Sequence, residues 1–328
     1  MAKQKEEKKL NLEETIKLLN KKYSKDFQES FSISTDSIAL DVALGGNGIR
    51  SKRITELIAW EGGGKTTLCL HLTKNAQKDH PGKKVVYIDA EHALDETYAR
   101  NIGVDWDNLI LFQPSCGEEG FDYAKELIRT GEVSLVIFDS TSGLLPKKQM
   151  EDVAGTSNMG LHARLMGAEI PKIQNLISEN NTACVSISQV REKIGVMFGS
   201  PETTQGGNAL KFWASNRIEL RKSLEKENDA VSGLKVKFKT LKCKTARPFQ
   251  TGYFYINFGK GVDKIKEIIE LSKDYDLIKV WGKKTTYNEA EFVTDEFYQV
   301  LEDNPSLYEE LKSKLVTIVS PVTEEVEQ

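Results

Sequence analysis

The sequence predicts an α/β protein whose main domain contains a mixed, mainly parallel twisted sheet flanked by helices. From about Phe31 to Phe258, short apolar runs alternate with segments of helical periodicity. The early runs include continuous apolar segments, such as Leu135–Phe138 within Ser134–Asp139, which are typical of parallel strands buried on both faces. The last three runs follow one another without intervening helices, so the far side of the sheet is expected to be antiparallel.

The expected strands are short apolar runs bounded by turn residues or by helical segments. They are Arg53–Ile58, Lys83–Asp89, Leu109–Gln113, Ser134–Asp139, Thr182–Ser188, Arg217–Arg221, Lys235–Leu241 and Tyr253–Phe258.

The two ends of the chain do not continue the alternation of strand-like and helical segments found in this central part. Leu10–Tyr23 has Leu and Ile at helical spacing and predicts one amphipathic helix, followed by the polar tether Ser24–Ser30. Such a helix cannot bury its apolar stripe alone, so it docks either on its own chain or on a neighbouring subunit. Beyond Gly261, a helix (Ile265–Asp274), a strand around Val280-Trp281 and a second helix (Glu296–Val316) predict a small α+β domain.

We therefore expect four regions. They are an N-terminal helix and tether (1–30), an α/β core (31–262), a small C-terminal domain (263–320) and a short acidic tail (321–328).

Composition and net charge narrow the classes of protein to which this chain can belong. The 328 residues are 39% hydrophobic and 29% charged, with a net charge of −4, as in a soluble globular protein. No apolar run approaches the roughly 20 residues that a bilayer span needs, and the charged N-terminus does not resemble a signal peptide. We expect a cytoplasmic protein without a membrane partner, in which any nucleic-acid binding comes from local clusters of positive charge.

A glycine-rich segment predicts a phosphate site. The strand Arg53–Ile58 runs into the sequence AWEGGGKTT and then into a helix, which is the context of a P-loop. Ala59 stands where the full pattern has its first glycine. Backbone amides and a lysine cradle the phosphates in such loops, and the hydroxyl of Thr66 can bind Mg²⁺. The expected phosphate-binding residues are Glu61, Gly62, Gly63, Gly64, Lys65, Thr66 and Thr67.

Three further strand ends carry polar groups suited to phosphate chemistry. Asp139 ends an apolar strand and can hold a Mg²⁺-bound water, although such an acid also caps helices. Glu91 lies just beyond a neighbouring strand, where a carboxylate can orient and deprotonate a water; the alternative is a solvated or capping acid. Gln189 ends a third strand immediately before a long loop, and its amide could report the γ-phosphate to that loop.

That loop, Ser188–Lys211, lacks helical or strand periodicity. It contains cations for phosphates, a Gly-Gly pair that lets a backbone approach closely, and apolar side chains that can enter gaps between bases. Long irregular loops inside compact domains are usually functional. The pattern therefore predicts a loop that binds single-stranded DNA, and the alternative is an ordinary surface loop.

Taken together, these segments resemble the bacterial RecA family of recombinases. The similarity extends from about Leu10 to Val316, and its most specific segments are ISTDSIALDVALGG, AWEGGGKTT, DAEHALD, MGLHAR, SQVREKIGVMFG and NALKFWAS. The resemblance implies a P-loop ATPase core and a recombinase that uses ATP and Mg²⁺. Such a protein forms a helical homo-oligomer on single-stranded DNA, pairs it with homologous double-stranded DNA and exchanges strands. Single-strand-binding and loading proteins are further candidate partners.

The resemblance also implies roles in the nucleotide site. Lys65 and Thr66 correspond to the Walker A pair, and Asp139 corresponds to the Walker B acid. Glu91 corresponds to the catalytic base and Gln189 to the nucleotide sensor.

Further positions correspond to the adenine contacts and to groups supplied in trans. Tyr98, with Asp95 beside it, matches the residue that stacks on adenine, and Phe258 stands where the family often has a second tyrosine. Lys242 and Lys244 match a pair that reaches the γ-phosphate from the adjacent subunit, so catalysis should need a filament. The alternative for these lysines is a solvated strand face.

For DNA, the resemblance implies two loops and a basic strip. The first loop contains Met159 and Gly160, with Arg164 nearby, and the second contains Arg191, Lys193, Ile194, Gly206, Gly207 and Asn208. The basic strip, proposed to hold the duplex, consists of Arg221, Lys222, Lys237 and Lys239. Phe212 and the N-terminal helix are expected at the subunit interface.

Several positions depart from the family pattern. Pro171 falls where the family has an arginine; it removes a phosphate contact and is expected to kink a helix, with Lys172 as a partial substitute. Glu192 adds negative charge to the second loop. The shorter tether and reduced acidic tail point to a divergent member, for which a phage is one candidate origin.

Two other functions share parts of this pattern. An accessory RecA paralogue would regulate filaments without exchanging strands, and it should lack a working Glu91 or the lysines Lys242 and Lys244, all of which are present. A hexameric helicase shares the ATPase core but not the long second loop or the small C-terminal domain. The main hypothesis is the recombinase.

Overall fold

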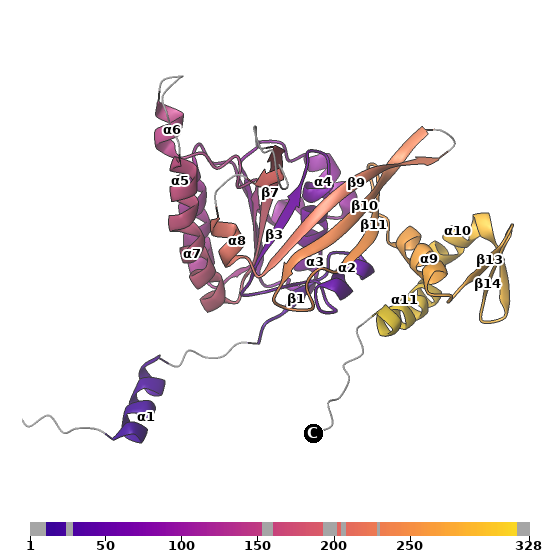
Figure 1. The fold of residues 1–328 in the computed structure, drawn as a ribbon, viewed down its shortest axis with the longest axis horizontal. Coiled ribbons are helices and arrows are strands. Elements are labelled where there is room, and N and C mark those ends of the chain that lie inside the picture. Colours follow the sequence, from indigo (N-terminus) through magenta and orange to yellow (C-terminus); the bar gives the residue numbers. More distant parts are fainter. Residues whose placement is uncertain are drawn as a thin grey trace, which may run out of the picture.

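The computed structural model describes residues 11–23, 29–152, 160–192, 202–204, 208–227 and 230–319. It confirms the predicted fold class, because one large, mainly parallel sheet forms its centre (Figure 1). The strands of this sheet are β3 (Ile54–Ala59), β4 (Lys84–Asp89), β5 (Leu109–Phe112), β6 (Val133–Asp139), β7 (Ala183–Glu192), β8 (Glu202–Thr204), β9 (Asn216–Glu227), β10 (Ala230–Cys243), β11 (Thr251–Asn257) and β12 (Gly261–Val262).

The strand order is β12-β11-β10-β9-β3-β7-β6-β4-β5, with β8 paired to β7. Strand β3 pairs in parallel with both β7 and β9, and β6 pairs in parallel with β7 and β4. From β9 outward, the pairs β9–β10, β10–β11 and β11–β12 are antiparallel, as the sequence predicted. All seven residues of β6 are buried, which explains its continuous apolar run.

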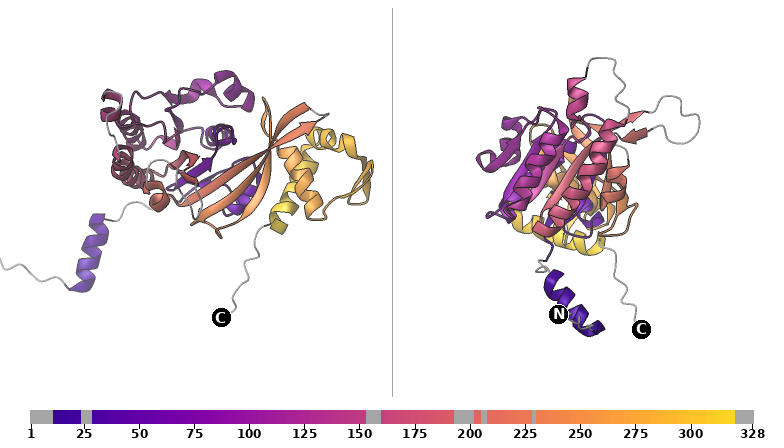
Figure 2. Two further views of the ribbon diagram at one scale, coloured as in Figure 1. Left: turned by 45° about the horizontal axis from the view of Figure 1, so that its top comes forward. Right: turned by 90° about the vertical axis from the view of Figure 1, so that its left-hand side faces the viewer.

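Helices cover both faces of the sheet (Figures 1 and 2). On one face, α3 (Lys65–Asp79) packs Leu68 and Leu72 into a core shared with β3, β6 and β10. On the other face, α5 (Gly117–Arg129) and α7 (Leu161–Asn180) pack against β4, β6 and β7. Helix α7 continues through Pro171, so the predicted kink does not end the helix there.

The remaining elements of this part are short. They are α1 (Leu12–Tyr23), β1 (Ser32–Ile33), α2 (Ile38–Ala43), β2 (Ile49–Arg50), α4 (Glu96–Ile102), the 3₁₀ turn η1 (Trp106–Asn108), α6 (Lys147–Glu151) and α8 (Ala209–Trp213). Helix α1 stands apart from the sheet in both views, and its Leu12 and Ile16 are exposed (Figures 1 and 2). Among the described residues, α1 is therefore not docked on its own chain.

The C-terminal elements form a second packed unit. They are α9 (Lys264–Asp274), β13 (Lys279–Trp281), β14 (Lys284–Tyr287), β15 (Ala290–Val293), the 3₁₀ turn η2 (Thr294–Glu296), α10 (Phe297–Asp303) and α11 (Pro305–Val319). The predicted single helix Glu296–Val316 is wrong, because α10 ends at Asp303 and Pro305 begins a new helix. Proline is favoured at such a first position because its missing N–H needs no partner there. The core of the unit also contains Ile38 and Val42 of α2.

Strand lengths are the other correction. The predicted strands Arg217–Arg221 and Lys235–Leu241 are the middles of β9 and β10, which are 12 and 14 residues long. Strand β7 continues to Glu192 and pairs with β8, so the irregular part of the predicted Ser188–Lys211 loop begins later than expected. Within the ranges described, no helix is both long and apolar enough to cross a membrane.

A buried charged cluster lies at the centre of the sheet, on three adjacent strands. Glu56 of β3 is fully buried. Its carboxylate accepts a hydrogen bond of 2.8 Å from the Ser188 hydroxyl on β7 and one of 2.5 Å from Nε of Arg217 on β9. The ion pair Glu56–Arg217 therefore joins the parallel strands to the antiparallel extension.

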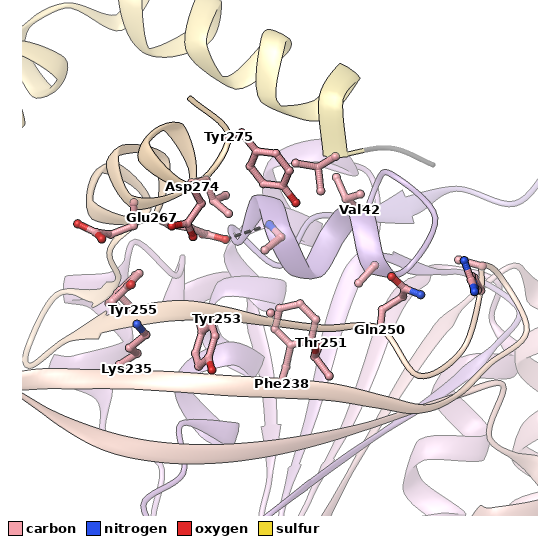
Figure 3. Close-up of a pocket in the computed structure, with 18 residues that line it drawn as sticks. Val42, Lys235, Phe238, Gln250, Thr251, Tyr253, Tyr255, Glu267, Asp274 and Tyr275 are labelled. Carbon is pink, nitrogen blue, oxygen red and sulfur yellow. Dashed lines mark hydrogen bonds between the residues drawn. The ribbon is translucent and has the colours of Figure 1, made fainter. Parts of the chain in front are cut away.

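A second buried carboxyl joins α9 to α2. Glu267 is 1% exposed and lines one side of a cavity of about 620 Å³ between β11, α2 and α9 (Figure 3). Its Oε1 accepts hydrogen bonds from the Ser37 hydroxyl (2.7 Å) and the Ala39 amide (3.0 Å) at the start of α2. Burial raises the pKa of Glu267 to about 8, despite the hydrogen bonds from Ala39 and Ser37 that favour its charged form. The carboxyl is thus mainly protonated at pH 7.

This raised pKa makes stability depend on pH. Because the folded pKa (about 8) lies above the usual 4.5, the stabilisation is complete below pH 4.5 and is lost as the pH rises towards 8, by up to about 1.4 kcal/mol per pH unit. We expect Glu267→Gln, which retains an acceptor without titrating, to be more stable than the wild type at pH 8.5 and similar at pH 4.5. Urea unfolding at the two pH values measures the difference.

The matched control is Glu270→Gln, which changes a less buried glutamate of the same helix that pairs with Lys273. Because it loses this ion pair, Glu270→Gln should not be more stable than the wild type at pH 8.5. An equal difference between wild type and Glu267→Gln at both pH values would contradict the assignment of a protonated Glu267.

Candidate nucleotide-binding site

The carboxyl ends of β3, β4, β6 and β7 meet at one edge of the sheet, because neighbouring strands among them are parallel. A cavity of about 270 Å³ lies there. Most of the residues predicted for the nucleotide site line it, although they come from distant parts of the chain. The lining residues are Glu61, Gly62, Gly63, Gly64, Lys65, Thr66, Thr67, Glu91, Tyr98, Asp139, Gln189, Leu234, Ile256 and Phe258.

The glycine-rich loop turns at this edge between β3 and α3. Gly64 has φ +85°, and a Cβ there would lie 2.5 Å from the Ile256 side chain, so glycine is required. The Lys65 ammonium donates to the carbonyl oxygens of Ala59 (3.1 Å) and Trp60 (2.9 Å). Burial lowers the pKa of Lys65, and the nearby carboxylates of Asp139 and Glu91 oppose this change. The lysine is therefore held inside the loop and beside two acids.

Thr66, Asp139 and Tyr87 form a compact cluster behind the loop. The Thr66 hydroxyl (2.9 Å) and the Tyr87 hydroxyl (2.7 Å) both donate to Oδ2 of Asp139. Burial raises the pKa of Asp139, whereas the hydrogen bonds from Tyr87 and Thr66 lower it. A carboxylate beside a hydroxyl is a donor set that suits Mg²⁺ together with phosphate oxygens and water. In the described ranges no group of three or more His, Cys, Asp or Glu forms a metal cluster.

Glu91 and Gln189 are in direct contact. Nε2 of Gln189 donates to Oε1 of Glu91 at 2.6 Å, although the two residues are 98 positions apart. Glu91 lies just beyond β4 and Gln189 lies within β7. The contact places the predicted base and the predicted sensor in one hydrogen-bonded pair at the cavity.

Two aromatic residues line the cavity beyond the phosphate loop. The Tyr98 hydroxyl lies 2.9 Å from Oγ1 of Thr67, and Phe258 is 53% exposed. Asp95 is not among the lining residues. Its carboxylate instead accepts the Tyr98 amide at 2.6 Å and caps the start of α4, which fixes the position of Tyr98.

Lys242 and Lys244 lie away from this cavity. The Lys242 ammonium donates to the carbonyl oxygens of Lys211 (2.9 Å) and Phe212 (3.0 Å) in α8. Lys244 lines a different cavity, of about 550 Å³, together with Phe212 and Trp213. Phe212 is 72% exposed. The chain thus presents both lysines and an exposed ring on a surface remote from its own phosphate loop.

Five residues predicted to bind DNA lie outside the described residues. They are Met159, Lys193, Ile194, Gly206 and Gly207. Gly160 precedes α7 with φ +81°, and Arg164 is exposed on the first turn of that helix. Lys172 follows about 12 Å further along the helix and donates to Glu169 at 2.7 Å, so it is not a neighbour of Arg164.

The other residues predicted to bind DNA are exposed. Arg191 lies on β7 opposite Thr203, and Asn208 precedes α8. Lys237 and Lys239 lie on β10, and Lys237 is paired directly with Arg221 of β9.

Lys222 does not belong to the basic strip. Successive strand residues face opposite sides of a sheet, so Lys222 points away from Arg221 and towards the phosphate loop. Its ammonium donates to the Glu61 carbonyl at 3.0 Å. Of the four residues predicted for the basic strip, Arg221, Lys237 and Lys239 therefore share one side of the sheet, and Lys222 does not.

Sequence reasoning missed Tyr87 and Lys222 as site residues. A signal existed for each. A tyrosine in a buried strand needs a partner for its hydroxyl, and Tyr87 lies near the end of a strand next to the strand that carries Asp139. Arg221 and Lys222 are successive residues of a strand, so their side chains had to lie on opposite faces of the sheet.

Comparisons with known proteins agree with this geometry. The chain matches the family model described as the RecA N-terminal domain over residues 1–263. It is 44% identical to Protein RecA of Porphyromonas gingivalis over 286 residues, which cover 86% of this chain and 84% of that protein. It is 40% identical to Protein RecA of Cytophaga hutchinsonii over 317 residues (93% and 89%), and 41% identical to Protein RecA of Clostridioides difficile over 286 residues (86% and 82%).

The Tyr87 hydroxyl generates a prediction. Tyr87→Phe removes a hydrogen bond that favours the charged form of Asp139. Residues that support a metal ligand typically contribute tenfold or more to metal affinity, so the Mg²⁺ concentration for half-maximal ATP hydrolysis should rise about tenfold. A Mg²⁺ titration of the ATPase rate checks this.

The control is Tyr287→Phe, which removes a hydrogen bond from a tyrosine to the Glu310 carboxylate in the C-terminal unit. It should leave the midpoint of the Mg²⁺ titration unchanged. Equal midpoints for all three proteins would contradict the role of Tyr87.

Proposed function

Since this chain belongs to the RecA family, it is a DNA recombinase and a DNA-dependent ATPase, and we propose that it binds ATP with Mg²⁺ in the cavity at the end of the parallel strands. The observation that carries the proposal is the convergence of the phosphate loop, Asp139, Glu91 and Gln189 at one cavity. Gln189 also belongs to β7, the strand that leads into the second DNA loop.

The phosphate loop holds the triphosphate. Backbone amides of residues 62–66 and the start of α3 face the phosphates, and Lys65 neutralises their charge. Thr66 and, through water, Asp139 would hold Mg²⁺, which supplies charge neutralisation between the β- and γ-phosphates. Tyr98 and Phe258 flank the adenine.

Glu91 orients the attacking water and accepts its proton. The hydrogen bond from Gln189 holds the Glu91 carboxylate in place. Because Gln189 lies close to the second DNA loop, a change in that loop on binding single-stranded DNA would move the amide and so reposition the base. This connection gives a physical reason for DNA-dependent hydrolysis.

Lys242 and Lys244 act on the γ-phosphate of the adjacent subunit. They lie far from their own phosphate loop, on a surface with the exposed Phe212. A head-to-tail interface that places this surface against the neighbour's cavity would complete each catalytic site and would propagate a helical filament. Helix α1, which stands apart from its own sheet, would dock on a neighbouring subunit.

Single-stranded DNA binds the two loops; within the described residues, Gly160, Arg164, Arg191 and Asn208 are the proposed contacts. Homologous duplex binds the strip Arg221, Lys237 and Lys239. The protein acts in the cytoplasm, and single-strand-binding and loading proteins are further partners. No described contact favours an accessory paralogue, which should lack a working Glu91 or the two lysines, all of which are present.

The first test is ATP hydrolysis with and without single-stranded DNA. We expect strong stimulation of the wild type by DNA. Glu91→Gln should lower kcat at least about 100-fold because the base is lost, while it retains DNA binding by fluorescence anisotropy. Glu126→Gln, on the exposed side of α5, should behave as the wild type. Wild-type hydrolysis that does not respond to DNA would contradict the proposed link and favour the paralogue.

A mixing experiment tests the lysines supplied in trans. Glu91→Gln has intact lysines, and the double variant Lys242→Ala/Lys244→Ala has an intact base. If the lysines act across the interface, equal mixing should restore up to about a quarter of the wild-type rate, because one random interface in four then combines an intact base with intact lysines. A mixture as inactive as its two components would show that the lysines act within their own subunit.

A further inference from the structure

His71 of α3 connects three segments of the chain. The residue is 2% exposed and lies six positions after Lys65 on the same helix. The backbone amide of Val262 donates to its Nε2 at 2.8 Å, and its Nδ1 lies 2.6 Å from Oδ2 of Asp36. The imidazole thus bridges β12 and the loop before α2 with the helix that begins at the phosphate loop.

These contacts fix one neutral tautomer. A backbone N–H can only donate, so Nε2 carries no proton, and Nδ1–H donates to the Asp36 carboxylate. Asp36 also contacts the ammonium groups of Lys74 and Lys264, the latter at 2.5 Å. Burial alone would raise the pKa of Asp36, but the hydrogen bond from His71 and the two lysines hold it well below its usual range. The carboxylate therefore remains charged and orients the imidazole.

The contacts of His71 also fix the position of residues that line the nucleotide cavity. Strand β12 pairs with β11 through Ile256↔Val262 and Asn257↔Gly261, so the turn between them, which begins with Phe258, has a defined position. Gly261 has φ +89°, and a Cβ there would lie 2.3 Å from Nε2 of His71. The backbone of β12 therefore approaches the imidazole edge closely, and only glycine allows it.

We propose that His71 is a positioning residue for nucleotide binding. It holds the turn that carries Phe258 at a fixed distance from the helix that carries Lys65 and Thr66, so that base and phosphates bind to one rigid unit. The inference rests on the proposed function, in which this cavity binds ATP. It concerns affinity rather than chemistry, because Glu91, just beyond β4, and Gln189, on β7, are not part of this connection.

The hydrogen bond from Val262 to His71 depends on the protonation state of the imidazole. Protonation of Nε2 would replace an acceptor by a donor that faces the N–H of Val262, and the hydrogen bond would be lost. Burial lowers the pKa of His71, and the hydrogen bond to Asp36 opposes this change. The connected form is therefore complete above the usual pKa of histidine and is lost as the pH falls through the lowered value. The charged or titratable groups around the imidazole, or across a cavity that it lines, are Asp36, Lys74, Lys260, Asp263, Lys264 and Tyr298.

Two substitutions of His71 separate the proposal from a general effect on folding. The amide of His71→Gln can donate to Asp36 and accept from Val262, and it does not titrate. His71→Leu fills similar space without either hydrogen bond. The measurements are the equilibrium binding of ATP with Mg²⁺ in the absence of DNA, and kcat and KM for ATP with single-stranded DNA, from pH 5.5 to 8.

At pH 7.5, His71→Leu should weaken ATP binding and raise KM about tenfold, because the Val262 amide and the Asp36 carboxylate each lose a buried hydrogen-bond partner, while kcat stays within about twofold. His71→Gln should bind ATP within about twofold of the wild type at this pH. Towards pH 5.5 the wild type should lose affinity more steeply than His71→Gln.

Binding by His71→Leu equal to that of the wild type would overturn the proposal. If His71→Leu does not fold, the pH profiles decide: equal acid dependence in the wild type and His71→Gln would overturn it, and a flatter profile in His71→Gln would support it. A wild-type protein that binds no ATP would instead refute the proposed function, and the inference with it.

Discussion

The buried ion pair between Glu56 and Arg217 is the contact on which the arrangement of the sheet depends. It joins β3, which leads into the phosphate loop, to β9, which begins the antiparallel extension. Ser188 adds β7, which leads to Gln189. Removing one partner of a buried pair typically costs about 3–5 kcal/mol, because the other charge stays in a low-dielectric interior. Three strands that carry different parts of the site are therefore held in one register.

The central fold could be predicted from the sequence because its strands are buried on both faces. Continuous apolar runs such as Ser134–Asp139 allow no other placement. The outer strands β9 and β10 were predicted too short, since the charged end of β9 (KSLEKE) and exposed apolar residues near the hairpin, such as Leu224 and Val231, resemble a solvated loop. The hairpin β14–β15 (KTTY, AEFV) was missed because its strands are only four residues long and mix polar with apolar residues. Pro305 was a visible signal that a single C-terminal helix must be divided.

The site could be predicted where a motif carries its own geometry. The phosphate loop needs only its glycines, its lysine and the preceding strand. The hydrogen bond between Gln189 and Glu91 depends on two strands separated by 98 positions, so no local pattern contains it. The same holds for Tyr87 and Asp139, and for His71, which looks like an isolated histidine until β12 is folded against α3. Resemblance placed Lys222 in the basic strip, but strand alternation places it at the phosphate loop.

The hydrophobic core of the small C-terminal unit includes two residues from outside the unit. Ile38 and Val42 of α2 pack into it beside Ile268, Leu311 and Leu315, whereas Ala39 and Ala43 of the same helix pack into the main core. Helix α2 thus contributes buried side chains to both hydrophobic cores. A protein shortened after Val262 would present two bare aliphatic side chains to water, and it should be prone to aggregate. The unit and α2 would have to be exchanged together in any chimaera between relatives, because both supply buried side chains to the same core.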